Sequence, residues 1–245
     1  MTAKTLASRD AIQWHSDIAS AFDAKYRGSP AFRERYALWT ALIDRFGARD
    51  HVVLDLGCGS GIFATYAAKR GAQVIALDGS DQMLALATRK AEQERLNNIR
   101  FVHSTLEEAP ALGLPLVDLL LCSSVLEYSG RLDRDLHFIS SSLKPGGVLL
   151  VSMPNAQSLY RRVERWAYRW FGVPRYYGCV KTITGETAFK GVLARHSLEV
   201  LDTRFYGAIG WFGAAMRMLG FARYADSLVV FACRKIERLP VPVPG

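Results

Sequence analysis

A glycine-rich turn between two acidic residues is the part of the chain whose residue types could bind a ligand. Gly57, Gly59 and Gly61 alternate directly after the apolar run at residues 52–56, and glycine lets the backbone approach a ligand because it has no Cβ. Asp55 precedes the turn, and Asp78 ends a second apolar run. A carboxylate before the turn suits a cationic amine better than a phosphate, and one that ends the second strand can accept hydrogen bonds from both ribose hydroxyls. The pattern predicts a site for a nucleoside with an amino-acid tail.

The glycine spacing separates this turn from the fingerprint of dinucleotide-binding proteins. That fingerprint is Gly-x-Gly-x-x-Gly, whereas this chain has Gly-x-Gly-x-Gly at residues 57–61. A dinucleotide-dependent oxidoreductase is therefore disfavoured. The structural alternative is that the glycines only close a tight turn between a strand and a helix.

Four motifs carry a resemblance to a known family. They are LDLGCGSG at residues 54–61, VIALDGSDQM at 74–83, VDLLLCSSVLEY at 117–128 and LKPGG at 143–147. In this order and near this spacing, they resemble the class I S-adenosylmethionine-dependent methyltransferases. The resemblance covers roughly residues 45–155, with weaker signs to about residue 235. It implies the fold and S-adenosylmethionine as cofactor, and it says little about the methyl acceptor.

The resemblance also implies roles for individual residues in cofactor binding. The loop after the third strand would meet the adenine. In this loop Thr105 replaces an aspartate that bonds the exocyclic amine in many relatives, so the resemblance does not assign that hydrogen bond to Thr105. The backbone amide of Leu106 can still reach a ring nitrogen. Met83 would pack on the adenine face or, as an alternative, only between helix and sheet. The residues expected to contact the cofactor are Asp55, Gly57, Cys58, Gly59, Gly61, Asp78, Gly79, Met83, Thr105, Leu106, Cys122 and Ser123.

The end of the fourth motif supplies the candidates for catalysis. Glu127 and Tyr128 would lie beside the transferring methyl group, but a tyrosine with a reference pKa of about 10 is a poor base at neutral pH and would instead orient an acceptor. His137 is a third candidate, and Tyr26 and His15 are further ones from the N-terminal segment. The alternatives are that His137 lies on a helix surface and that Glu127 caps a helix.

Alternating strands and helices must position these residues. Strands are expected near residues 52–56, 73–78, 99–103, 116–122, 147–152, 198–206 and 226–235. Helices are expected near 10–26, 31–46, 61–70, 80–95, 132–143, 155–171 and 184–196. Ser29 and Pro30 should start the second helix, and Thr184 should cap the last one. We predict an α/β class fold: a Rossmann-like, seven-stranded, mostly parallel sheet with helices on both faces.

One domain is expected to span residues 1–235, followed by an extended tail at 236–245. Within that domain, residues 1–46 would form an N-terminal helical lid. Residues 153–180, a helical insertion after the fifth strand, and residues 207–225 would form insertions on the acceptor side. Neither insertion fits a simple alternation of strands and helices.

The positive charge of the chain lies in the half that should choose the acceptor. Residues 156–235 contain 13 Lys+Arg and 5 Asp+Glu, which accounts for the net charge of +8, whereas residues 1–155 are neutral. Arginines alternate with aromatic residues between positions 159 and 177. A basic, aromatic, amphipathic helix suits an anionic membrane surface, or an acidic or lipid-like acceptor such as a quinone, a phenol or a lipid-linked sugar. The alternative is that its aromatic face packs on the core. The acceptor-side candidates are Tyr26, Tyr160, Trp166, Arg175, Tyr176 and Tyr177.

Cysteine and histidine usage narrows the remaining classes. The four cysteines are scattered without a Cys-x-x-Cys motif, which indicates reduced thiols, and the five histidines show no metal-ligand spacing. The chain has no signal-peptide pattern and no apolar run of about 18 residues. We expect a cytoplasmic protein, peripheral to the inner face of a membrane if the basic helix binds lipid.

The expected function is S-adenosylmethionine-dependent methylation of a small-molecule or lipid-like acceptor at a hydroxyl oxygen, by in-line displacement. Three alternatives stay open: N-methylation of a small amine or phospholipid head group, nucleic-acid methylation, and cofactor binding without catalysis. Nucleic acid is the weaker partner, because an Asn/Asp-Pro-Pro-Tyr/Phe motif does not follow the fourth strand. The oligomeric state is left open.

Overall fold

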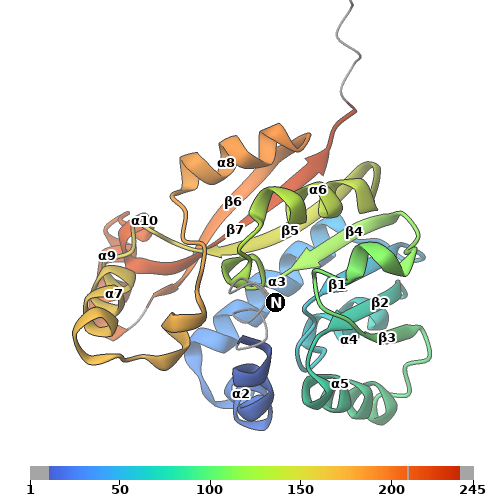
Figure 1. Ribbon diagram of the computed structural model, residues 1–245, viewed down its shortest axis with the longest axis horizontal. Coiled ribbons are helices and arrows are strands. Elements are labelled where there is room, and N and C mark those ends of the chain that lie inside the picture. Colours follow the sequence, from blue (N-terminus) through green and yellow to red (C-terminus); the bar gives the residue numbers. More distant parts are fainter. Residues whose placement is uncertain (1–10, 209, 238–245) are drawn as a thin grey trace, which may run out of the picture.

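Seven strands form a single mixed sheet in the order β3-β2-β1-β4-β5-β7-β6 (Figure 1). The computed structural model describes residues 11–208 and 210–237. The strands are β1 (Val52–Leu56), β2 (Gln73–Asp78), β3 (Ile99–His103), β4 (Val117–Cys122), β5 (Leu143–Pro154), β6 (Leu198–Ala208) and β7 (Asp226–Lys235). Strands β1 to β5 pair in parallel, and β7 runs antiparallel to both β5 and β6. This confirms the predicted seven-stranded, mostly parallel sheet.

Helices follow the strands along most of the chain. They are α2 (Ala19–Gly28), α3 (Pro30–Phe46), α4 (Ile62–Lys69), α5 (Asp81–Gln93), α6 (Leu132–Ser142), α7 (Leu159–Phe171), α8 (Glu186–Arg195), α9 (Gly210–Met218) and α10 (Ala222–Ala225). Residues 11–17 are also helical and are separated from α2 by a turn at Ile18, where the sequence predicts one helix. Short 3-10 helices are η1 (Ala109–Leu112), η2 (Leu126–Tyr128) and η3 (Arg175–Cys179).

Two of the predicted helix starts need correction. Helix α8 begins at Glu186 with Gly185 as its N-cap, so Thr184 is not the cap, and Thr184 instead forms a bridge with Asn155. Helix α7 begins four residues later than expected because the Asn155 side chain donates to the carbonyl oxygens of Arg223 (2.7 Å) and Asp226 (2.8 Å). The backbone before α7 is therefore tied to β7.

Ser29 and Pro30 stand at the start of α3 as predicted. Pro30 is the first helical residue, where its missing N–H costs nothing. Ser29 occupies the N-cap position, but its hydroxyl makes no capping hydrogen bond there.

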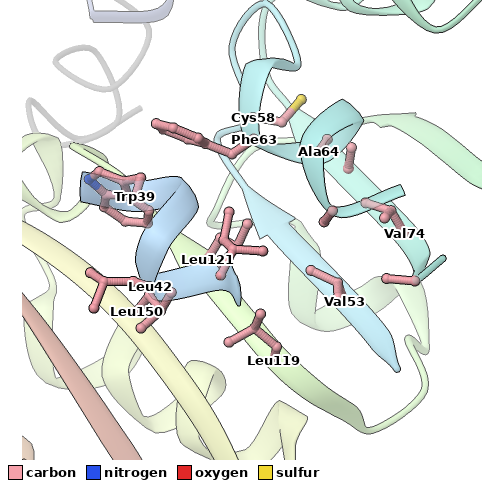
Figure 2. Packing of buried hydrophobic residues seen from close by; sticks show 14 of the residues in the cluster. Trp39, Leu42, Val53, Cys58, Phe63, Ala64, Val74, Leu119, Leu121 and Leu150 are labelled. Atoms are coloured by element: carbon pink, nitrogen blue, oxygen red, sulfur yellow. The ribbon is translucent and has the colours of Figure 1, made fainter. Parts of the chain in front are cut away.

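The sheet is buried on both faces, which explains why its central strands are mostly apolar, with Asp55 in β1 and Asp118 in β4 as exceptions. On one face, α3, α4 and α5 pack against the sheet. Trp39 of α3 stacks on Phe63 of α4 with a ring-centroid distance of 5.1 Å, and Leu42 lies near Leu119 and Leu121 of β4 (Figure 2). On the other face, side chains of α6 and α8 cover the sheet. Burial of each such large side chain stabilises the fold by about 1.5–3 kcal/mol.

The strand order reverses between β1 and β4, and this reversal determines where a ligand can bind. To one side of that point the order runs β1, β2, β3, and to the other it runs β4, β5. The connections at the carboxyl ends therefore diverge and leave a crevice, which is where α/β sheets bind ligands. The glycine turn after β1 lies at this crevice.

Candidate functional site

The glycine turn presents its backbone to a cavity. Gly59 and Gly61 have φ angles of 54° and 73°, in the left-handed region that favours glycine. A Cβ on Gly61 would lie 2.7 Å from the Ala87 Cβ, so this glycine lets α4 start close to α5. A Cβ on Gly59 would meet none of the described atoms within 4 Å, because the backbone there faces open space. Gly57, Cys58 and Gly59, three of the residues expected to contact the cofactor, line the cavity, and Gly61 supports the turn from behind.

The cavity has a volume of about 380 Å³, within the range of about 300–1,000 Å³ that small-molecule sites occupy. Its floor is formed by the residues that follow β1, β2 and β4. Its cover comes from the N-terminal helices, including Ile12, Trp14 and Phe22. The predicted lid segment therefore lies over the predicted cofactor residues.

Asp78 holds the turn in place and still has room for a ligand. One of its carboxylate oxygens accepts a hydrogen bond from the Gly59 amide (2.8 Å), and the other accepts one from the Ser80 amide (2.9 Å). A carboxylate offers about four acceptor positions, so two remain. Burial raises the pKa of Asp78, and the two amide hydrogen bonds oppose that rise. The side chain lines the cavity, where ribose hydroxyls were predicted to meet it.

Asp55 and Cys122 do not reach the cavity wall. Asp55 is buried under the turn, where a hydrogen bond from the Ala64 backbone stabilises its charge at the start of α4. Burial and the neighbouring Asp78 raise the pKa of Asp55 to about 7. Its Oδ2 atom is buried without a hydrogen-bond partner among the described residues. Asp55 therefore lies one layer below the position expected for direct contact with an amine.

The predicted adenine end is built by the turns after β2 and β3. Met83, Leu106 and Gly79 line the cavity, and Met83 is buried at the start of α5. Thr105 lines it too, but its amide and hydroxyl both bond to one Glu108 carboxylate oxygen, at 3.0 and 2.9 Å. Its side chain thus shapes the turn instead of replacing the aspartate of many relatives. The residue that remains for a ring nitrogen is Leu106, through its amide.

Arg35 of α3 is a site residue that the sequence reasoning missed. Its Nη2 atom donates to the hydroxyl (2.6 Å) and the carbonyl oxygen (3.3 Å) of Ser123, directly after β4. The guanidinium lies over the Phe63 ring, 5.9 Å from its centroid. Its Nε atom is buried with no hydrogen-bond partner among the described residues. This arrangement leaves a cation prepared for an anionic group at the end of the cavity formed after β4, whereas Asp78 ends β2 on the other side of β1.

His15, Glu127 and Tyr128 meet near that end of the cavity. The His15 and Tyr128 rings are in edge contact, with centroids 5.3 Å apart. The His15 Nδ1 atom lies 2.8 Å from the Ala11 carbonyl oxygen, and burial lowers the pKa of His15. Glu127 is buried, with an Oε2 atom that has no partner in the described part of the chain, and burial raises its pKa to about 7. Burial also raises the pKa of Tyr128, which disfavours its phenolate form.

The structure does not bring every predicted residue to the cavity. His137 is exposed on α6, because Leu136 and Ile139 on either side of it face the sheet, so this candidate base was wrong. Tyr26 and Tyr176 line the cavity, whereas Tyr160, Trp166 and Tyr177 do not. The side chain of Arg175 lies outside the described residues. Among the described helices, none has the length and apolarity that a membrane span requires.

Known proteins resemble this chain in sequence and in structure. A family model described as a methyltransferase domain matches residues 31–203. The tRNA 5-carboxymethoxyuridine methyltransferase of Escherichia coli K12 is 36% identical over 149 residues, which cover 58% of this chain and 57% of that protein. The ubiquinone biosynthesis O-methyltransferase of Acinetobacter baylyi is 33% identical over 103 residues, covering 42% of this chain and 43% of that protein. The matched parts span about half the length of these relatives.

A solved structure shares the fold at low sequence identity. The magnesium protoporphyrin IX methyltransferase of Synechocystis PCC 6803, determined with bound S-adenosylhomocysteine, superposes with a TM-score of 0.69 and 15% identity. The superposition covers 94% of this chain and 99% of that one. The α/β arrangement described above is therefore shared across nearly the whole chain.

Proposed function

The chain belongs to the methyltransferase-domain family, and from this premise we propose that it transfers the methyl group of S-adenosylmethionine to a small-molecule or lipid-like acceptor. The observation that carries the proposal is one cavity lined by Asp78 at the end of β2, by the Gly59 backbone after the neighbouring β1, and by Arg35, which is bonded to Ser123 after β4. S-adenosylmethionine combines ribose hydroxyls with an amino-acid carboxylate, and these groups need an acceptor and a cation at separate places.

The residues present fit this cofactor. Asp78 keeps two acceptor positions for the ribose after bonding the Gly59 and Ser80 amides. The unpartnered Nε–H of Arg35 would donate a charge-assisted hydrogen bond to the carboxylate of the amino-acid tail. Met83 and Leu106 supply apolar surface for the adenine. The buried Asp55 would support the turn from beneath.

S-adenosylmethionine supplies an electrophilic methyl group on a sulfonium, so the protein has to align the acceptor and remove its proton. His15 is placed for proton removal. Its Nδ1 donates to the Ala11 carbonyl oxygen, which leaves the lone pair on Nε2, and its lowered pKa keeps the imidazole neutral at pH 7. Tyr128 fixes the ring through the edge contact.

The cavity wall favours an aromatic or lipid-like acceptor with a hydroxyl group. Aromatic side chains of Trp14, Phe22, Phe32 and Tyr176 line it, and such a wall binds flat apolar rings. The likeness to a ubiquinone biosynthesis O-methyltransferase supports the same chemistry. Oxygen methylation is therefore the first reaction that we propose.

A second candidate reaction is methylation of an amine. The unpartnered Oε2 of Glu127 is buried at the cavity, and a carboxylate there would pair with an ammonium group of a small amine or phospholipid head group. Glu127 has a pKa of about 7, so it would also accept a proton from the amine near neutral pH.

The cofactor assignment is tested by two ligands and two variants. Arg35→Ala should weaken S-adenosylhomocysteine binding by about 10- to 100-fold, because a charged hydrogen-bonded pair is lost. Methylthioadenosine lacks the amino-acid tail, so its affinity should stay the same in this variant. Arg45→Ala, on the same helix but in a surface ion pair with Asp202, is the matched control for both ligands. Isothermal titration calorimetry measures the affinities of both ligands for the unmodified protein and for each variant.

Equal affinity of Arg35→Ala and the unmodified protein for S-adenosylhomocysteine would sink the assigned role of Arg35. If neither ligand binds the unmodified protein, the cofactor assignment itself fails. The acceptor class is then read from transfer of a labelled methyl group to phenols, quinols, amines and tRNA. Transfer to tRNA alone would contradict a small-molecule acceptor and agree with the likeness to the tRNA methyltransferase.

A further inference from the structure

Helix α7 turns one charged pair inward and exposes several of its large apolar side chains to the solvent. Arg161 and Glu164 are buried, whereas Val163, Trp166 and Trp170 are 61%, 57% and 67% exposed. This is the reverse of an ordinary surface helix, in which the apolar stripe faces the core. The alternative in which the aromatic face packs on the core is therefore wrong for these three side chains.

Buried hydrogen bonds fix the inward face of α7, and breaking them would destabilise the fold. Arg161 Nη1 donates to the Glu164 carboxylate (2.8 Å), and Arg161 Nε donates to the Ser227 carbonyl oxygen of β7 (3.1 Å). The Tyr176 hydroxyl accepts from Arg161 (2.8 Å) and donates to Glu164. Rotating α7 to bury its tryptophans would break this buried network and expose an ion pair instead. The outward direction of Trp166 and Trp170 is thus built into the fold.

A second apolar segment lies beside α7. Met218, Leu219 and Phe221, at and after the end of α9, are 89%, 73% and 51% exposed. Helix α10 contacts both α7 and α9, and the three helices form one corner of the molecule (Figure 1). We call the side chains of Val163, Trp166, Trp170, Met218, Leu219 and Phe221 the α7–α9 surface.

Ion pairs hold the α9 part of this surface in position. Arg217 pairs with Glu34 of α3 and with Asp226 at the start of β7. The charged side chain thus anchors α9 inward, while the neighbouring Met218 points to solvent. Both parts of the α7–α9 surface therefore use a buried or partly buried arginine to keep apolar side chains outside.

The charges around the α7–α9 surface indicate what kind of partner it fits. Arg162, Arg165 and Arg169 are exposed on α7, and Glu164, the one acidic residue of this helix, is buried in the pair with Arg161. The exposed face of α7 therefore combines cations with tryptophans. We propose that the α7–α9 surface docks on the head-group region of an anionic lipid bilayer, with the tryptophans in the interface and the arginines near lipid phosphates.

A second copy of the chain fits this surface poorly. A symmetric dimer would place the same patch on both subunits, so exposed arginines would face exposed arginines. An anionic bilayer instead attracts all three arginines and accepts the apolar side chains. Tryptophan is also a residue that prefers the boundary between lipid and water.

Docking would bring the cavity close to the bilayer. Arg161 and Tyr176, on the inner side of the α7 region, line the cavity. The cavity would thus lie about one helix diameter, roughly 10 Å, from the lipid. This suits a lipid-like acceptor, but the docking surface stands on its own residues and does not depend on the proposed function.

Vesicle binding tests the proposal. The probes are phosphatidylcholine vesicles with and without phosphatidylglycerol, measured by co-sedimentation. We expect binding to the anionic vesicles that is at least about tenfold stronger than to neutral ones, because each basic residue near an anionic surface contributes to binding. Brominated lipids should quench tryptophan fluorescence in the bound protein.

Two variants and two matched controls locate the binding surface. Trp166→Ser/Trp170→Ser and Arg162→Glu/Arg169→Glu should each reduce binding to anionic vesicles by at least about tenfold. Leu116→Ser, at an exposed apolar residue before β4, and Arg89→Glu, at an exposed arginine on α5, should bind as the unmodified protein does. Circular dichroism and S-adenosylhomocysteine affinity show whether each variant is folded.

Three outcomes would overturn the proposal. They are equal affinity for neutral and anionic vesicles, no binding to either, and a concentration-dependent dimer in solution that Trp166→Ser/Trp170→Ser abolishes. Since all substituted residues of these variants lie outside the cavity wall, vesicle binding and cofactor binding can fail separately. Loss of S-adenosylhomocysteine binding in every form would count against the proposed function and leave the docking result standing.

Discussion

His15 combines the three properties of a proton acceptor: a place in the cavity wall, a lowered pKa and a tautomer fixed by its Nδ1 contact. Neutral imidazole is the active form of a base. Because burial lowers the pKa of His15, the neutral form remains the main form at pH values below 6.5, the ordinary pKa of histidine being about 6.5. With a hydroxyl acceptor, we expect kcat to be constant at neutral pH and to fall as the pH drops through a value below 6.5. His15→Gln should lower kcat by about 10²- to 10⁴-fold and leave S-adenosylhomocysteine affinity unchanged.

The pH at which kcat falls shows whether His15 or Glu127 accepts the proton. Glu127 has a pKa of about 7, so a profile controlled by this carboxyl would fall around pH 7 and would keep that shape in His15→Gln. His137→Gln changes an exposed histidine on α6 and should leave both kcat and the profile as they are. A full loss of activity in Glu127→Gln, with His15→Gln fully active, would assign the proton to Glu127.

At the scale of one helix, the buried pair of Arg161 and Glu164 keeps α7 in its inverted orientation. Glu164→Ala removes the carboxylate that is hydrogen-bonded to the buried Arg161 guanidinium, and we expect the free energy of unfolding to fall by about 3–5 kcal/mol. The double variant Arg161→Met/Glu164→Leu removes both charges, so its free energy of unfolding should fall less than that of Glu164→Ala. Urea unfolding measures the three values.

The control for this cycle is Arg162→Ala, which changes an exposed arginine on the same helix and should shift the unfolding free energy by less than about 0.5 kcal/mol. A double variant that is less stable than Glu164→Ala would show that the unpaired charge is not the main cost of breaking the pair. It would also show that Ser227 and Tyr176, which share the network, depend on Arg161 more than on Glu164.

The spacing of apolar residues predicts the helices and strands well, but it does not show which face of a helix turns inward. The alternating apolar runs gave the seven strands, and the glycine turn and Asp78 were located because their signals are local. The α7 pattern is equally regular, yet its orientation depends on contacts of Arg161 with Tyr176, which follows the helix, and with Ser227, which is 66 residues away in the sequence. Arg35 has no local signature either, because only the packing of α3 brings it to Ser123 after β4.

At the scale of the molecule, one lysine connects the lid to the glycine turn. Lys90 of α5 donates to Asp23 of α2 (2.8 Å) and to the Ser60 carbonyl oxygen within the turn (3.0 Å). Burial alone would raise the pKa of Asp23, but the hydrogen bond and charge of Lys90 help to lower it below its ordinary value. A second tie joins Ser16 of the lid to Ser80 at the start of α5 (2.7 Å). The helices over the cavity are thus attached to the same α5 that buttresses Gly61 through Ala87.

This connection predicts how far the effect of cofactor binding spreads. With S-adenosylhomocysteine bound, amide hydrogen exchange should slow in residues 11–28 and 57–61, which line the cavity or adjoin it, and not in α8 on the opposite face of the sheet. Lys90→Met removes both hydrogen bonds, so residues 19–28 should lose that protection and the ligand should dissociate about tenfold faster. Lys69→Met, which breaks a surface pair with Glu94, is the control and should change neither measurement. Protection that appears equally on both faces of the sheet would mean that the ligand stabilises the whole fold, and the lid would then have no separate closing motion.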